Sequence, residues 1–314
     1  MILRTLHRRP TRRVLVHGLR YFAPMFAELM NGDGWDFRYW PDTGIRNLAS
    51  IASELRCCDI AYQIGGRVTI GKFLRAAKLM KKKTIVMHWA GSDTLDDQQR
   101  VAEGRANPWV LQNIHHWAVS GWMAREVQAF GARCELVPLP SAHVPQSPSP
   151  LPEEFSVLVY MPDTRRGLLY GLDQILQVAR ELVHIRFDLV GLLHGSIPAP
   201  PPNLHIHGRI PNLRGFYERA SVVWRPMRHD GLSCMVMEAL GHGRHVLWSY
   251  AFPGCRQVYS ASDAREEILR LHELHRRKRL SINHEGARAL VDGGYMPAQL
   301  RYTIRERLEA LLES

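Results

Sequence analysis

The chain has 314 residues, of which 46% are hydrophobic and 23% are charged, and its net charge is +11. This composition is typical of a globular protein, and the length favours two domains of roughly 150 residues each. The sequence contains no run of roughly 18 apolar residues, which argues against a membrane-spanning helix, and its basic N-terminal segment lacks the apolar core of a secretory signal. The five cysteines form no CxxC pair and indicate neither a disulfide framework nor a thiolate zinc site, so a reducing, cytoplasmic setting is expected.

Short apolar runs alternate with helical stretches in the first half of the chain. The runs occupy residues 13–18, 58–66, 83–91, 116–120 and 134–140, and helices are predicted at 22–30 and 72–83. Apolar strands that alternate with helices are typical of parallel α/β units. Residues 1–142 are therefore predicted to form one Rossmann-like domain.

A proline-rich segment follows, and residues 143–154 are predicted to be an interdomain linker because this proline density suits neither a helix nor a central strand. A second series of apolar runs lies at residues 155–161, 185–191, 203–208, 221–226 and 244–249, with helices predicted at 172–182, 212–220 and 233–242. Residues 155–295 are predicted to be a second Rossmann-like domain. The segment 296–314 has an apolar stripe with helical spacing and is predicted to pack back on the first domain.

The predicted fold class is therefore α/β, with two doubly wound domains that face a cleft. Sheets of this kind bind ligands at the carboxyl ends of their strands. We expect the functional residues in the loops that follow the strands.

One such loop lies in the segment of residues 228–249, RHDGLSCMVMEALGHGRHVLWS. Ser233 is suited to cap the helix that follows, and the first backbone N–H groups of that helix, up to Val236, would face an anion at the strand ends. Asp230 would lie in the loop, and Glu238 in the second helical turn is placed to accept hydrogen bonds from a diol. The alternative is that Asp230 is a turn residue and Glu238 only complements the helix dipole.

This segment resembles the nucleotide-sugar motif of retaining glycosyltransferases with the GT-B fold, family four. Asp230 stands where the family has Glu, and His245 where it usually has Pro. The positions that agree in register are Gly231, Ser233, Glu238, Ala239, Gly243, Val246 and Ser249. Residues 118–140, 188–191 and 203–226 are similar to family segments in the same order, so the resemblance covers most of the chain from about residue 85 onward.

The resemblance implies that a nucleotide-diphosphate sugar binds mainly to the second domain. In the family an Arg and a Lys hold the donor diphosphate; here Arg165 has the Arg position, Tyr170 replaces the Lys, and Arg166 is a candidate to compensate. Glu238 inherits a contact with the nucleotide ribose, and Asp230 a contact with a sugar hydroxyl. The other donor-binding candidates are Gly231, Leu232 and Ser233 at the helix start.

The first domain supplies candidates for the acceptor side. Gly18 corresponds to a turn near the donor phosphates and the acceptor, and His88 and Asp93 resemble a strand-end segment that faces the acceptor. The alternative for His88 is a hydrogen-bonded histidine without a catalytic role. Residues 66–73, GRVTIGKF, match part of a phosphate-binding loop, but Phe73 stands where Ser or Thr would bind magnesium, which leaves a nucleoside triphosphatase as an alternative.

Together these features predict a retaining hexosyltransferase that moves a sugar from a UDP- or GDP-linked donor to a glycan, lipid-linked or other acceptor in cell-surface glycan or glycolipid assembly. The catalytic candidates are Arg165, Asp230, Glu238 and His88. No metal and no cofactor besides the nucleotide-sugar co-substrate are expected, because the resemblance implies metal-independent transfer. A cytoplasmic enzyme is predicted, with peripheral contact at the anionic inner face of a membrane as an option.

Two alternatives remain open from the sequence. The changes at Asp230 and Tyr170 also fit a GT-B scaffold that binds a nucleotide sugar without turnover. The net charge and the basic clusters at residues 8–9, 12–13, 81–83 and 276–279 fit a protein associated with nucleic acid, including a glycosyltransferase that acts on nucleic acid. The same clusters are equally typical of solvated helix faces.

Overall fold

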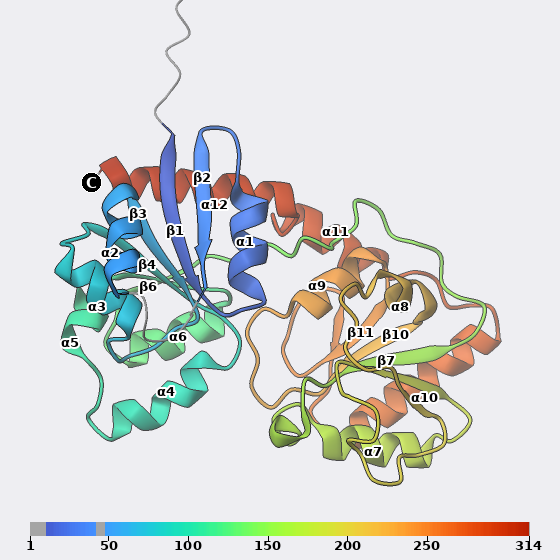
Figure 1. Ribbon diagram of the computed structural model, residues 1–314. Coiled ribbons are helices and arrows are strands. Elements are labelled where there is room, and N and C mark those ends of the chain that lie inside the picture. Colours follow the sequence, from blue (N-terminus) through green and yellow to red (C-terminus); the bar gives the residue numbers. More distant parts are fainter. Residues whose placement is uncertain (1–10, 42–47, 314) are drawn as a thin grey trace, which may run out of the picture. The chain divides into compact units, whose positions relative to one another are not determined.

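A computed structural model describes residues 11–41 and 48–313 of the chain (Figure 1). The described chain divides into two compact units: the first comprises the residues up to Ala142 together with those from Ala298 onward, and the second comprises His143–Pro297. Each unit contains one six-stranded sheet with helices packed against it. The predicted α/β class with two doubly wound sheets is confirmed.

The first sheet has the strand order β2-β1-β3-β4-β5-β6, and all neighbouring strands are parallel. Its strands are β1 (Arg12–Gly18), β2 (Trp35–Trp40), β3 (Ile60–Ile64), β4 (Thr84–Trp89), β5 (His115–Ala118) and β6 (Cys134–Leu136). The helices of this unit are α1 (Phe22–Met30), α2 (Leu48–Cys57), α3 (Lys72–Leu79), α4 (Asp93–Ala102), α5 (Pro108–Gln112), α6 (Gly121–Ala129) and α12 (Pro297–Glu313).

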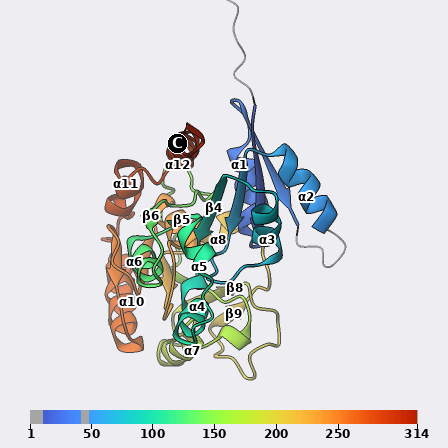
Figure 2. The same cartoon turned by 90° about the vertical axis from the view of Figure 1, so that its left-hand side faces the viewer.

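Helix α12 contributes to the core of the first unit. Ile304 and Leu308 follow each other at helical spacing, are fully buried, and belong to the same apolar cluster as Val16 of β1 and Phe26 of α1. Figure 2 shows α2 and α3 on the opposite side of this sheet from α12. The Arg305 guanidinium also donates from Nη2 to the Met30 carbonyl at 2.6 Å, which satisfies a carbonyl group at the end of α1.

The second sheet has the strand order β12-β11-β10-β7-β8-β9 and is also parallel throughout. Its strands are β7 (Ser156–Tyr160), β8 (Arg186–Val190), β9 (Leu204–Ile206), β10 (Val222–Arg225), β11 (His245–Trp248) and β12 (Cys255–Gln257). The helices are the 3₁₀ turn η2 (Thr164–Arg166), α7 (Leu172–Glu181), α8 (Arg214–Arg219), α9 (Cys234–Gly241), α10 (Ala261–Arg276) and α11 (His284–Asp292).

A buried arginine attaches the segment of residues 143–154 to the second unit. This segment contains no helix or strand. Arg244 is fully buried and donates to the carbonyl oxygens of Ser149, of Pro150 at 2.9 Å and of Ala220 at 3.2 Å. None of the described helices combines the length and the apolar character needed to cross a bilayer.

Candidate functional site

The second sheet changes winding direction between β7 and β10. From β7 the chain proceeds through β8 to β9, and then returns to β10 on the other side of β7 and proceeds through β11 to β12. In an open parallel sheet such a switch point leaves a crevice at the carboxyl ends of the two strands, and ligands bind there. The two strands end at Tyr160 and Arg225. The loops that follow these residues form the candidate functional site.

These two loops lie against each other. Gly171 precedes α7 in the left-handed region, with φ of 68°, and a Cβ added to it would approach the Pro226 carbonyl oxygen to 2.3 Å. The Arg228 N–H donates to the Leu169 carbonyl at 2.9 Å. Glycine at position 171 therefore allows the loop after β7 to pack directly on the loop after β10.

The loop after β7 carries two exposed arginines. Asp163 accepts the Arg166 N–H at 3.1 Å and thereby caps the 3₁₀ turn η2. The Arg165 guanidinium lies 3.2 Å from the Asp163 carboxylate, and its side chain is 88% exposed. Both predicted phosphate-binding arginines therefore lie in the loop at the switch point, and the guanidinium of Arg165 is accessible to a ligand.

Asp230 is buried and bound by neighbouring side chains. Arg225 donates to it from Nε at 2.5 Å and from Nη2 at 3.1 Å, so each carboxylate oxygen accepts one hydrogen bond from the guanidinium. The Trp248 indole N–H donates to the same carboxylate at 3.2 Å, and the Asp230 N–H donates to the Tyr250 hydroxyl at 3.0 Å. The predicted contact of Asp230 with a sugar hydroxyl would have to compete with these bonds.

The start of α9 follows Asp230 closely. Gly231 is buried, Leu232 is half-buried, and Ser233 occupies the N-cap, where its hydroxyl accepts the Val236 N–H at 3.4 Å. The Val236 N–H is thus bound by the cap and is not one of the groups open to an anion.

Glu238 lies in the second turn of α9 and is only 5% exposed. Its Oε2 accepts the hydroxyl hydrogen of Tyr217 at 2.8 Å. Burial and the neighbouring carboxylate raise the pKa of Tyr217, so the phenol stays protonated and remains the donor. This hydrogen bond fixes one oxygen of the Glu238 carboxylate in place.

The first sheet has its own switch point between β1 and β3. Gly18 ends β1 with φ of 128°, and a Cβ added to it would lie 1.7 Å from the Ile64 carbonyl oxygen at the end of β3. Only glycine permits this close approach of the two strand ends. Gly18 therefore lies at the carboxyl-end edge of the first sheet, the edge at which open parallel sheets generally bind ligands.

The glycine turn after β3 is held by acidic side chains of α4. Asp93 accepts the Gly66 N–H at 2.8 Å, and Asp97 accepts the Val68 N–H at 2.8 Å. Burial raises the pKa of Asp93 to about 7. Phe73 is buried at the start of α3. A phosphate-binding loop keeps its N–H groups open to the anion, so this arrangement argues against the nucleoside triphosphatase alternative.

His88 is fully buried on β4, and both of its ring nitrogens have protein partners. The Val137 carbonyl lies 2.6 Å from Nε2, which must therefore carry the hydrogen, and Nδ1 accepts from the Tyr62 hydroxyl at 2.6 Å. Burial lowers the pKa of His88 to about 3 and keeps the ring neutral. This geometry supports the alternative that His88 is a hydrogen-bonded histidine without a catalytic role. Neither ring nitrogen is left to contact the acceptor of the sugar.

The basic clusters are partly neutralised within their own units. Arg276 and Arg277 lie 2.8 Å and 2.5 Å from the Glu273 carboxylate, and Arg12 lies 2.8 Å from Glu309. The cluster at residues 8–9 lies outside the described residues. Across residues 11–41 and 48–313, no group of three or more His, Cys, Asp or Glu side chains is placed to hold a metal ion.

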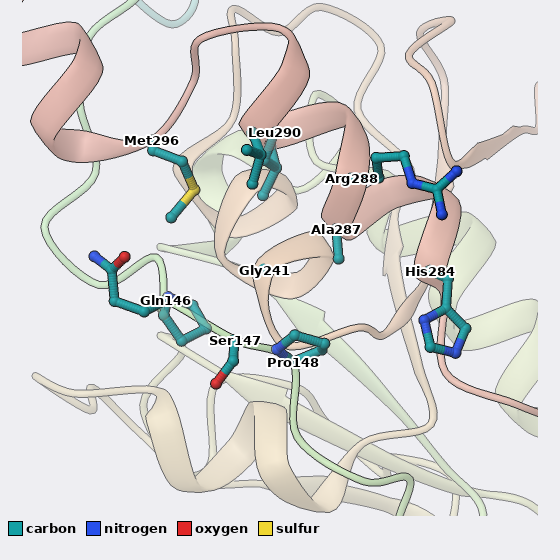
Figure 3. Close-up of a pocket in the computed structure, with 11 residues that line it drawn as sticks. Gln146, Ser147, Pro148, Gly241, His284, Ala287, Arg288, Leu290 and Met296 are labelled. Carbon is teal, nitrogen blue, oxygen red and sulfur yellow. The ribbon is translucent and has the colours of Figure 1, made fainter.

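A separate cavity of about 260 Å³ lies in the second unit at the far end of α9 (Figure 3). Its lining includes Ser147, Gly241, His284, Arg288, Leu290 and Met296. None of the predicted site residues lines this cavity. Ser233 caps one end of α9 and Gly241 forms the other, so the cavity is separated from the candidate site by the length of the helix.

Arg225 and Tyr217 are not among the site residues predicted from the sequence. A signal for Arg225 is present, because a charged residue ends an otherwise apolar strand immediately before Pro226. Tyr217 lies in the segment 203–226 that resembles the family, but an aromatic residue in a helix is more often a core residue than a site residue. Its role becomes visible only through its hydrogen bond to Glu238.

The architecture is similar to solved structures of other proteins. Sucrose-phosphate synthase from Thermosynechococcus elongatus has a TM-score of 0.73 at 10% identity, over 96% of this chain and 100% of that chain. HepE from Anabaena, solved in complex with UDP-glucose, has a TM-score of 0.70 at 12% identity, over 95% and 99% of the two chains. TarM of S. aureus has a TM-score of 0.61 at 14% identity, over 85% of this chain.

This chain spans 58% of the TarM chain, which is less than two thirds of its length. No model of a protein family matches the sequence, and the comparison with curated proteins gives no match either. At identities of 10–14% the similarity establishes the GT-B fold.

Proposed function

We propose that this protein of GT-B fold is a glycosyltransferase that binds a nucleotide-diphosphate sugar at the switch point of its second sheet. The observation that carries the proposal is the meeting, at one edge of this sheet, of the arginine loop after β7 and the loop that leads into α9. Guanidinium groups donate paired hydrogen bonds to phosphate oxygens, and a helix N-terminus attracts anions. HepE has this fold and is solved with UDP-glucose, which supports the same class of donor here.

In this proposal Arg165 and Arg166, together with the positive end of the α9 helix dipole, stabilise the negative charge that grows on the departing diphosphate. Electrostatic stabilisation of this kind is usually the largest catalytic contribution of a site. Glu238, held by Tyr217, accepts hydrogen bonds from the ribose of the nucleotide. These cationic groups support transfer without a metal ion, and the resemblance of residues 228–249 supports retention of the anomeric configuration.

The acceptor is proposed to bind to the first unit, at the edge of the sheet where Gly18 ends β1. We propose a glycan or a lipid-linked acceptor and a cytoplasmic enzyme of cell-surface glycan or glycolipid assembly. The exposed lysines Lys81 and Lys83, which follow α3, suit peripheral contact with an anionic membrane. His88 is omitted from the proposed catalytic residues because both of its nitrogens are bound within the core.

The first test is calorimetric titration with UDP, GDP and ADP and their glucose conjugates, in the presence of EDTA. The wild-type protein is expected to bind one of these nucleotides with micromolar affinity. Glu238→Ala is expected to lose this binding, whereas Glu273→Ala, which removes a carboxylate from α10 outside the site, should retain it. Binding of none of these nucleotides by the wild-type protein would refute the proposal.

Turnover is tested separately with the donor that binds. Release of the nucleoside diphosphate in the presence of glycan or lipid-linked acceptors would establish transfer, and NMR of the product would give the anomeric configuration. Tight donor binding with neither transfer nor slow donor hydrolysis would instead identify a nucleotide-sugar-binding scaffold.

A further inference from the structure

A charged residue ends the central strand of the second sheet. In β10 the residues Val222, Val223 and Trp224 are fully buried and apolar, and Arg225 follows them at the switch point. Its side chain is only 10% exposed. The residue paired with it in register at the end of β11 is Trp248. Burying a charged side chain costs free energy, so packing alone does not explain an arginine at this position.

Neighbouring groups hold the Arg225 guanidinium in one orientation. Nε and Nη2 bond to Asp230, and the guanidinium carbon lies 5.6 Å from the ring centroid of Tyr170 and 6.0 Å from that of Tyr160. Burial lowers the pKa of Arg225, but the charge and hydrogen bonds of Asp230 outweigh this effect and the net shift is upward. The group is therefore a fixed, permanent cation.

The third guanidinium nitrogen, Nη1, remains available. Because Nε and Nη2 share one edge of the planar group and face Asp230, Nη1 is directed away from that carboxylate. No residue of the described chain accepts a hydrogen bond from Nη1. This nitrogen is also not one of the buried side-chain atoms that lack a hydrogen-bond partner, so it is not sealed from a ligand. One cationic donor thus remains unsatisfied at the switch point.

A purely structural ion pair accounts poorly for this arrangement. A buried ion pair seldom stabilises a protein more than well-packed apolar residues do, and the carboxyl ends of the strands on either side are aromatic, Tyr160 and Trp248. Another arginine–aspartate pair of this sheet, Arg186 with Asp188, lies at the start of β8, and its arginine is 45% exposed. Of these two pairs, the buried one, Arg225 with Asp230, lies at the carboxyl ends of the strands, where open parallel sheets bind ligands.

We infer that Arg225 binds the diphosphate of the donor through Nη1, and that Asp230 is a positioning residue for Arg225. This inference rests on the proposed function. The Tyr170 ring lies beside the guanidinium, so the cation missing from position 170 is supplied from β10 instead. Arg225 then adds a buried cation to the exposed Arg165, and the loss of a lysine at position 170 does not imply loss of donor binding.

The test compares ligands that differ only in phosphate number: UDP, UMP and uridine, with the guanosine and adenosine series measured in the same way. Arg225→Leu is expected to weaken binding of the diphosphate by about 10- to 100-fold, the effect of one charged hydrogen bond, and to leave binding of the nucleoside unchanged. A merely structural role would weaken all three ligands alike.

Because Arg225→Leu removes the cation that faces the buried Asp230 carboxylate, a second variant is needed. Arg225→Leu/Asp230→Asn removes both charges, and its thermal unfolding shows whether the fold is kept. Adding Tyr170→Lys to this variant returns a cation to the same place and should restore diphosphate binding by about tenfold. The matched control is Arg186→Leu, which breaks an arginine–aspartate pair of the same sheet and should leave binding unchanged.

The two proposals fail in different ways. If the wild-type protein binds no nucleotide, the proposed function is wrong and this inference is wrong with it. If the wild-type protein binds a diphosphate and the folded double variant binds it equally well, only the role of Arg225 is refuted. Equal losses for the diphosphate and the nucleoside would also refute that role.

Discussion

Acidification is expected to destabilise the first unit through His88. The folded protein holds this histidine with a pKa of about 3 because the ring is buried, whereas an unfolded histidine has a pKa of about 6.5. Between these values the unfolded chain binds more protons than the folded one. Stability is therefore lost as the pH falls through this window.

The size of the effect follows from the two pKa values. At pH 5 the ring is still neutral in the folded state and almost fully protonated in the unfolded state. Going from pH 7 to pH 5 therefore removes about 2 kcal/mol of stability through His88 alone. His116, whose pKa burial lowers to about 4, has the same sign and adds to the loss.

The variant His88→Gln isolates this contribution. Amide hydrogen exchange of peptides from β3 and β4 reports the free energy of opening of this sheet, and it is measured at several pH values for both proteins after correction for the intrinsic exchange rate. Between pH 7 and pH 5 the wild-type protein should lose about 2 kcal/mol more than the variant. An equal loss in both proteins, or an NMR titration that shows His88 protonating near pH 6.5 in the folded state, would refute this reasoning.

Three further predictions concern single side chains. Ile304→Ala removes buried volume from the first core and should lower the free energy of unfolding by about 2–5 kcal/mol in urea titrations, whereas Tyr302→Ala, at a side chain 69% exposed on the same helix, should change it by less than about 0.5 kcal/mol. Gly171→Ala should displace the loop after β7 and weaken donor-nucleotide binding at least about tenfold in calorimetry. The control is Gly195→Ala, because Gly195 has a similar positive φ, 75°, but open space around it. Equal losses of binding in the two variants would count against the contact between the loops. Arg244→Met should leave buried carbonyl groups unpaired and therefore lower the melting temperature of the second unit by several degrees in calorimetric scans. An unchanged transition would show that the packing of residues 143–154 does not depend on this arginine.

The fold class could be predicted because the inner strands are continuous apolar runs. β7 and β4 are buried along most of their length, and this pattern is visible in the sequence. The strand β2 (Trp35–Trp40) was missed, because it lies at the edge of its sheet, with several half-buried residues and no clear alternation. An edge strand does not need the apolar pattern on which prediction depends.

The candidate site could be located from the sequence but its internal contacts could not. The position of Ser233 follows from a strand–loop–helix pattern, and that of Arg165 from the family resemblance; the structure contains a helix cap at the first and a loop after β7 at the second. The pairing of Asp230 with Arg225 does not follow, because it depends on the direction in which a strand-end side chain points into the loop. The same is true of His88, whose burial depends on a carbonyl group of Val137, which is far along the chain.

The contribution of α12 to the first core has a consequence for the order of events during synthesis. The second unit is one continuous stretch, His143–Pro297, and can fold when that stretch has left the ribosome. The first unit has its sheet by residue 136, yet Ile304 and Leu308 arrive only after the whole second unit has been made. Until then the face of that sheet that α1 and α12 cover together lacks the part contributed by α12, so the first unit is the half of the nascent chain that most needs a chaperone.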